Sequence, residues 1–162
     1  MRTLLLLFAM IFICSTTGNT QKLVFLFGHA EYANAVGDLK NLNDNGIGGE
    51  AGIGVGVGKT FFVGTIGTTF LSKANNSTAG TLRYTPLKAG IRRYIVRKNI
   101  FVKADAGMAN MKYSKHSDGS TKFTSTFGAG VKFTGVEAIA DFTNVANFGS
   151  WISLKAGFTL GI

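Results

Sequence analysis

The feature that most constrains the fold is an alternation of apolar and polar residues that runs almost continuously from Leu23 to Ile162. In EAGIGVGVG, residues 50–58, the odd positions are apolar and the even positions are glutamate or glycine. In ISLKAGFTLGI, residues 152–162, the even positions are apolar and the odd ones are serine, lysine, glycine or threonine. A period of two indicates β-strands whose two faces meet different surroundings. The sequence therefore predicts an all-β protein.

Eight segments carry this alternation. They predict strands over residues 23–34, 47–58, 60–72, 81–96, 99–114, 121–133, 136–145 and 150–162. The links alternate in length: those at 58–60, 97–99 and 134–135 are short, whereas the others are longer and rich in the Asn, Asp, Gly and Ser that turns favour. An up-and-down sheet with short turns at one end and longer loops at the other is typical of an outer-membrane barrel.

A glycine-rich run, GIGGEAGIGVGVGKT at residues 46–60, ends in Gly-Lys-Thr and invites comparison with a nucleotide-binding loop. The phosphate-loop pattern G-x-x-x-x-G-K-[ST] needs a glycine where this chain has Ile53, and the dinucleotide pattern G-x-G-x-x-G fails as well. Both patterns precede a helix, but the next segment is rich in β-branched and aromatic residues. We therefore interpret the glycines as the inner face of a strand.

The two stripes of each strand leave two orientations. A soluble, secreted or periplasmic barrel would turn the apolar stripe inward around an apolar ligand, whereas a membrane barrel turns it outward. Strands of nine or more residues suit a tilted bilayer crossing, and strands of soluble proteins average about five or six. Aromatic residues gather by the short turns (Phe61, Phe62, Tyr94, Phe101, Phe133) and by the loops (Tyr32, Phe70, Tyr84, Tyr113, Phe123, Trp151), as interfacial girdles do. These observations favour the membrane barrel.

In that orientation the polar stripe lines an interior that eight strands leave just wide enough for side chains. The predicted interior cations are Lys88, Arg92, Lys103, Lys122, Lys132 and Lys155, and the anions are Glu31, Glu50, Asp105, Glu137 and Asp141. Buried charges need partners, and glycines on the same stripe would make room for the long charged side chains. We expect a salt-bridged network that closes the barrel, with a proton path or ligand site as the alternative.

Three stretches carry a resemblance to a known family. They are AVGDL at 35–39, TPLKAGIRRYIVRKNIFVKADAGM at 85–108 and the closing ISLKAGFTLGI. They resemble the outer membrane protein beta-barrel domain family, which comprises OmpA/OmpX-like small eight-stranded barrels of the Bacteroidetes type. The resemblance implies an eight-stranded antiparallel up-and-down transmembrane β-barrel in a bacterial outer membrane, inserted by the barrel-assembly machinery. The family includes structural proteins, adhesins and assembly factors, so the resemblance implies location more than role.

The N-terminal segment resembles a secretory signal peptide, with a basic start and an apolar run at 4–13 that is too short to span a bilayer. We expect a signal peptide at 1–20 and the barrel domain at 21–162. Cleavage would remove Cys14, the only cysteine, and with it any disulfide. The net charge of +9 suits nucleic acid, anionic lipid or acidic partners; export argues against nucleic acid and favours lipid.

No catalytic, cofactor-binding or metal-binding set is predicted. Ser114, His116 and Asp118 could be drawn as the triad of a lipid-modifying enzyme, but they are neighbours in one loop. His29 shares a face with Glu31, and we prefer a polar contact at the barrel mouth over a metal site.

Arg83 and Lys112 fall on the outward stripe near the loop ends of adjacent predicted strands. There they would either contact lipopolysaccharide phosphates or extend into water. Taken together, the predictions describe a monomeric structural or surface-interaction protein without enzyme activity.

Overall fold

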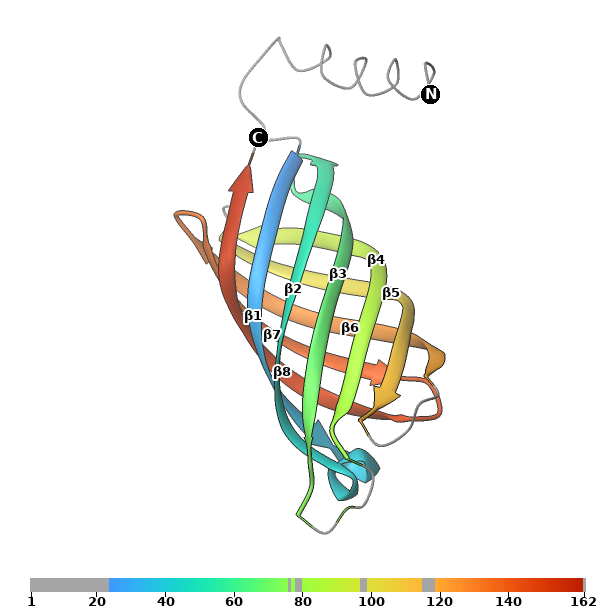
Figure 1. Ribbon diagram of the computed structural model, residues 1–162. Helices are drawn as coiled ribbons and strands as arrows, with labels where there is room; N and C mark the ends of the chain where they lie inside the picture. The colour runs from blue at the N-terminus through green and yellow to red at the C-terminus, as the bar shows by residue number, and fades with distance from the viewer. Residues whose placement is uncertain (1–23, 76, 78–79, 97–98, 115–118, 162) are drawn as a thin grey trace.

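Eight antiparallel strands close into a barrel in the computed structural model, which describes residues 24–75, 77, 80–96, 99–114 and 119–161 (Figure 1). The strands are β1 (Val24–Val36), β2 (Asn43–Val57), β3 (Thr60–Lys73), β4 (Leu82–Val96), β5 (Ile100–Tyr113), β6 (Ser120–Phe133), β7 (Val136–Val145) and β8 (Gly149–Gly161). Each strand pairs with its neighbours in the chain, and β1 also pairs with β8, which closes the sheet. The predicted all-β, eight-stranded, up-and-down barrel is confirmed.

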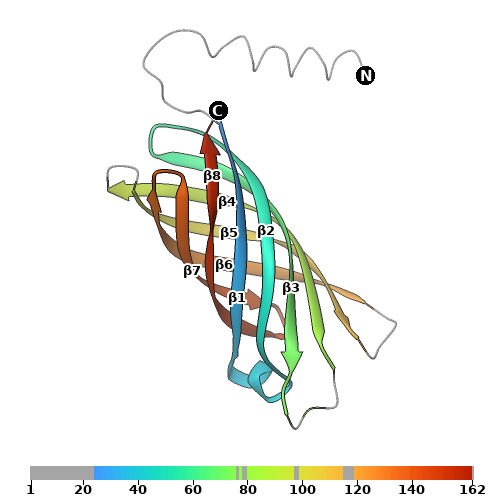
Figure 2. The ribbon, with the colours of Figure 1, turned by 60° about the vertical axis from the view of Figure 1, so that its left-hand side comes forward.

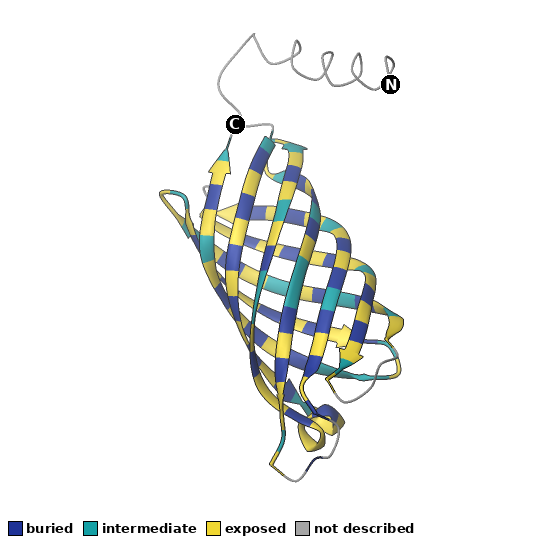
Figure 3. Ribbon diagram, in the orientation of Figure 1, coloured by how far each residue is buried: buried dark blue, intermediate teal, exposed yellow. Residues whose placement is uncertain are grey.

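Burial alternates along every strand, as the bands of Figure 3 show. In β2, Ile53 and Val55 are exposed while Glu50 is buried. In β4, Leu87 and Ile91 are exposed while Lys88 and Arg92 are buried. The polar stripe therefore faces the interior and the apolar stripe faces outward. This is the orientation predicted for a membrane barrel.

The two ends of the barrel differ in their connections (Figures 1 and 2). At one end, where β1 begins and β8 ends, Gly58 and Lys59 join β2 to β3, and Thr134 and Gly135 join β6 to β7. Thr134 and Gly135 have φ of 45° and 92°, the left-handed pair that a two-residue hairpin turn requires. We call this the short-turn end and the opposite one the loop end.

The first connection at the loop end is shorter than predicted. The sequence favoured a loop over 35–46, but β1 continues to Val36, a 3-10 helix, η1, occupies Gly37–Asn41, and β2 begins at Asn43. The side-chain amide of Asn43 donates to three backbone carbonyl oxygens, those of Leu71, Ser72 and Gly80. The turn-forming composition of this segment thus conceals a strand start that is fixed by side-chain hydrogen bonds.

Two further points concern the rest of the chain. Among the described residues, no helix has the length and apolar character needed to cross a bilayer. The predicted signal peptide, residues 1–20, lies outside the residues that the structure describes.

Candidate functional site

The barrel interior consists of three layers along its axis. The layer at the short-turn end is apolar and largely aromatic, and contains Phe25, Phe27, Phe61, Val63, Tyr94, Phe101 and Ile139. Its rings meet edge to face: the centroids of Phe25 and Phe61 lie 5.1 Å apart, and those of Phe61 and Tyr94 lie 5.8 Å apart. This aromatic layer fills the interior next to the short turns.

The layer at the loop end is also apolar. It contains Ala33, Ala35, Leu39, Leu71, Leu82, Tyr84, Ala109, Met111, Val145 and Trp151. Leu39 comes from η1, which packs against β1, β2 and β8 at this end. The rings of Tyr84 and Trp151 cross at 81° with their centroids 4.7 Å apart. Buried side chains therefore fill the interior next to the loop end.

These layers correct the prediction of two outward aromatic girdles. Of the residues assigned to girdles, Phe61, Tyr94, Phe101, Tyr84 and Trp151 are buried inside the barrel, and Tyr113 packs partly buried against the loop-end layer. The other residues assigned to girdles are exposed, namely Phe62, Phe133, Tyr32, Phe70 and Phe123. Consecutive strand residues face opposite sides, so proximity to a strand end did not decide which surface each ring joins.

A charged band lies between the two apolar layers. Its buried members are His29, Glu31, Glu50, Lys88, Arg92, Lys103, Asp105, Glu137, Asp141 and Lys155. Glu50 is its centre: Nζ of Lys155 lies 2.6 Å from Oε2, Nζ of Lys103 lies 3.5 Å from Oε1, and Nζ of Lys88 lies 4.0 Å from Oε2. One carboxylate thus faces three ammonium groups.

A second group in the band is built on Glu137. Nη1 of Arg92 donates to both oxygens of this carboxylate, at 2.9 and 3.0 Å. The guanidinium carbon of Arg92 also lies 4.3 Å from the ring centroid of Phe101 and 5.0 Å from that of Phe25. Such cation–π contacts are favourable, so Arg92 joins the charged band to the aromatic layer.

His29 connects the two carboxylates. Its Nδ1 lies 3.4 Å from Oε1 of Glu50, and its Nε2 lies 3.0 Å from Oε2 of Glu137. A ring that donates from both nitrogens would satisfy both carboxylates, because ionised carboxylates only accept hydrogen bonds. The prediction that His29 lies at the barrel mouth is therefore wrong. It follows Phe25 and Phe27 on the inward stripe, and this apolar run hid its place in the charged band.

Two aspartates complete the network. Nζ of Lys103 lies 3.1 Å from Oδ2 of Asp105 and 3.2 Å from Oδ2 of Asp141. Nζ of Lys155 lies 2.9 Å from the same Asp141 oxygen. Since both lysines also approach Glu50, the ion pairs form one connected set that joins β2, β5, β7 and β8.

Glu31 and Lys88 also form hydrogen bonds with threonines, and two predicted interior residues lie outside the band. Glu31 accepts a hydrogen bond of 2.9 Å from Oγ1 of Thr69, and Nζ of Lys88 donates to Oγ1 of Thr126 at 3.1 Å. Lys122 and Lys132 are half-buried on the inward stripe near the two ends of β6, outside the charged band. Every other predicted interior residue lies in the band.

The inward glycines accommodate rings as well as charges. A Cβ added at Gly128 would overlap the carboxylate of Asp141, as the sequence suggested, but one added at Gly54 would overlap the ring of Phe25. The same overlap arises for Gly52 with Phe27, for Gly130 with Phe101 and for Gly90 with Asp105. The glycines therefore allow dense filling in the charged band and in the aromatic layer alike.

Little space is left within the charged band. A cavity of about 10 Å³ lies among Glu31, Glu50, Thr69, Lys88 and Lys155, with other residues of the wall. This volume is close to the room that a single water molecule needs. The band is therefore filled by side chains.

Within the described ranges, no group of three or more His, Cys, Asp or Glu residues is placed to hold a metal ion. Of the triad considered from the sequence, Ser114 accepts a hydrogen bond of 3.2 Å from the backbone N–H of Thr81. His116 and Asp118 lie outside the described residues.

The outer wall carries its own features near the loop end. Arg83 and Lys112 are exposed and lie directly opposite each other on β4 and β5. The guanidinium carbon of Arg83 is 5.8 Å from the ring centroid of Phe70 on β3. The basic pair thus sits on the same wall as the apolar stripe, beside an exposed ring.

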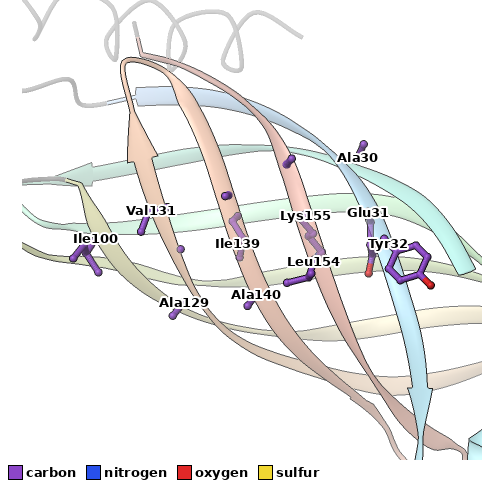
Figure 4. A pocket seen from close by; sticks show the side chains of 13 residues that line it. Ala30, Glu31, Tyr32, Ile100, Ala129, Val131, Ile139, Ala140, Leu154 and Lys155 are labelled. Atoms are coloured by element: carbon purple, nitrogen blue, oxygen red, sulfur yellow. The ribbon is translucent and has the colours of Figure 1, made fainter. Parts of the chain in front are cut away.

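A shallow hollow of about 720 Å³ lies elsewhere on this wall, over β1, β8, β7, β6 and the start of β5 (Figure 4). Its floor is formed by alanines, including Ala30, Ala129 and Ala140, and larger side chains such as Leu154 and Ile100 border it. Small residues on a lipid-facing wall let neighbouring molecules approach the backbone closely.

Comparisons with known proteins define the fold class. No family model matches the chain, and no curated protein matches it. Among solved structures, Neisserial surface protein A is 13% identical, with a TM-score of 0.53 over 86% of this chain and 97% of that one. Ail, the attachment invasion locus protein of Yersinia pestis, is 16% identical, with a TM-score of 0.51 over 85% and 97%.

A third structure is the N-terminal β-barrel domain of Pseudomonas aeruginosa OprF. It is 16% identical, with a TM-score of 0.53 over 84% of this chain and 97% of that one. The chain therefore has the fold of the small eight-stranded outer-membrane barrels of the OmpA/OmpX-like kind, as its sequence resemblance predicted.

Proposed function

We propose that this protein is an integral β-barrel of a bacterial outer membrane, with a closed polar interior and a structural or surface-interaction role. The observation that supports this most is the orientation of the wall: charged side chains point inward while Ile, Val, Leu and Phe point outward. In water this arrangement would bury ions and expose apolar surface, both at a cost. In a bilayer the outward stripe is favourable, and the soluble ligand-binding alternative requires the reverse.

The dimensions of the apolar belt support the same proposal. Along β2 the outward apolar residues extend from Ile47 to Val57, which is about 33 Å of extended strand. A strand tilt of about 40° reduces this to a height of about 25 Å, the apolar band expected of outer-membrane barrels. Export through an N-terminal signal peptide and insertion by the barrel-assembly machinery are parts of this proposal.

The filled interior supports a role other than that of a pore. Water-filled channels belong to barrels of about sixteen strands, whereas eight strands leave an interior that side chains can fill. Here the aromatic layer, the charged band and the loop-end layer follow one another along the axis. We propose a monomer without enzyme activity whose function resides on its surfaces.

The partners that we propose are outer-membrane lipids, lipopolysaccharide among them. Arg83 and Lys112 are exposed on the outward stripe near the loop end. Basic side chains at that level are attracted to anionic headgroups. We therefore propose that lipopolysaccharide contacts the wall at β4 and β5.

Cell fractionation with a gel-mobility assay tests the proposal. We expect the protein in the outer-membrane fraction and a change in electrophoretic mobility on boiling, since a detergent-resistant barrel migrates differently from its unfolded chain. Purified protein in planar bilayers should show no stepwise conductance. Recovery in the soluble periplasm without a mobility change would refute the membrane proposal, and regular conductance steps would refute the closed interior.

A further inference from the structure

We infer that four outward side chains on β4 and β5 form a binding site for a phosphorylated sugar headgroup in the outer leaflet. These residues, the β4–β5 patch, are Arg83, Thr85, Asn110 and Lys112. The inference rests on the proposed function, because it requires this wall to face lipid. The inference goes beyond the proposed function because it assigns the phosphate to the basic pair, Arg83 and Lys112, and the sugar to the polar pair, Thr85 and Asn110.

The register of the two strands makes the patch compact. Arg83 lies directly opposite Lys112, and Thr85 lies directly opposite Asn110. Side chains that face each other across an antiparallel pair are about 5 Å apart, and the neighbours two residues along a strand are about 7 Å apart. Four side chains of two chemical kinds therefore surround an area of the size of one sugar ring and its phosphate.

The basic pair lacks a counter-charge within the protein. Like charges directly opposite each other on a sheet are destabilising, and neither Arg83 nor Lys112 forms an ion pair with another described residue. The carboxylates that the chain could offer are mostly committed to the interior band. An anion bound from outside the protein would relieve this repulsion. The guanidinium group of Arg83 lies beside the ring of Phe70.

The polar pair lies at the level of the wall where the outward apolar belt ends. The next outward pair toward the barrel middle is Leu87 and Met108, which are apolar and are 67% and 51% exposed. Thr85 and Asn110 follow immediately toward the loop end, so they reach headgroup level rather than acyl chains. A hydroxyl and an amide both donate and accept hydrogen bonds, which suits sugar hydroxyl and amide groups better than a simple phosphate.

The experiment compares binding of three lipids by the full-length barrel in vesicles of neutral phosphatidylcholine. The lipids are a phosphorylated glucosamine-based lipid A, the same lipid without its phosphates, and phosphatidylglycerol, which has phosphate but no sugar. The variants are R83Q/K112Q for the basic pair and T85V/N110L for the polar pair. R93Q, which removes an outward cation near the short-turn end of β4, is the matched control.

We expect wild-type protein and R93Q to bind lipid A most tightly. Loss of the two charge-assisted contacts in R83Q/K112Q should weaken lipid A binding by about tenfold or more. T85V/N110L should weaken it by about three- to tenfold and leave phosphatidylglycerol binding unchanged. Equal wild-type affinity for lipid A and phosphatidylglycerol, or lipid A binding unchanged in either double variant, would overturn the inference.

A mobility assay on the same vesicles separates this inference from the proposed function. Wild-type protein that inserts and shows the folded mobility but fails to discriminate among the three lipids overturns the inference alone. Wild-type protein that does not insert contradicts the membrane proposal and the inference with it. Both double variants should retain the folded mobility, since their side chains lie on the surface.

Discussion

The middle of the barrel and its two ends fill the same narrow interior with opposite chemistry. In the middle, Lys155 and Glu50 meet at 2.6 Å within a set of linked ion pairs. At the short-turn end Phe25 packs on Phe61, and at the loop end Tyr84 packs on Trp151. In the closed interior that we propose, the apolar layers limit access of water to the charged band. A charge lost from the band therefore cannot be replaced by solvent, whereas an apolar residue at an end can be exchanged for another of similar volume.

The largest expected effect is that of Glu50→Gln. The amide preserves the shape of the side chain but removes the charge that faces Lys88, Lys103 and Lys155. Removing one partner of a buried ion pair costs about 3–5 kcal/mol, so the free energy of unfolding should fall by about that amount. Urea unfolding in lipid vesicles measures it, with fluorescence of the buried Trp151, the only tryptophan in the chain, as reporter.

Asp44→Asn is the matched control for this variant. Asp44 is an exposed carboxylate near the loop end, and such surface substitutions change stability by less than about 0.5 kcal/mol. If Glu50→Gln lowered the free energy of unfolding no more than Asp44→Asn does, the stability of the charged band would not depend on the Glu50 charge.

The fold could be predicted from the sequence because one signal repeats along the whole chain. The period-two pattern located every strand to within a few residues, and the length of the links gave the topology. The start of β2 was missed because residues 43–46 have turn-forming composition, while the hydrogen bonds that fix Asn43 come from β3 and the segment after it. No local pattern reports those contacts.

The site was only partly predictable for a related reason. The odd or even position of a residue along a strand indicates whether its side chain points inward. On this basis Glu50, Lys103 and Asp141 were assigned to the interior. This alternation does not indicate how deep a side chain lies along the barrel axis or which residue it contacts, because both depend on how the strands are staggered around the barrel. His29 joined the charged band only through its register with Glu50 and Gly157. The inward aromatic layers were missed for another reason: the rings were assigned by their position near strand ends, which does not indicate the face of the sheet that they join.

A second prediction concerns the loop-end layer. Leu71 is fully buried there, and Leu71→Ala removes apolar contacts and leaves a cavity that the surrounding wall cannot fill. The expected loss is about 3 kcal/mol of unfolding free energy, measured by the same urea titration. Leu71→Met keeps the volume and should cost less than about 1.5 kcal/mol. Equal losses for both variants would mean that volume does not govern this layer, and the contrast with the charged band would disappear.

The smallest expected effect separates the inner from the outer glycines. Gly128 faces Asp141 inside the barrel, and an added Cβ would overlap that carboxylate, whereas a Cβ at Gly64 meets only the Cγ2 atom of Ile53, 4.0 Å away. Gly128→Ala should displace Asp141 from its lysine partners and destabilise the barrel by about 1–3 kcal/mol. Gly64→Ala should be neutral or stabilising by up to about 1 kcal/mol, because alanine restricts the unfolded chain. Urea titration of the two variants side by side decides the point: if Gly64→Ala proved as costly as Gly128→Ala, the glycines would serve backbone conformation rather than the filling of the interior.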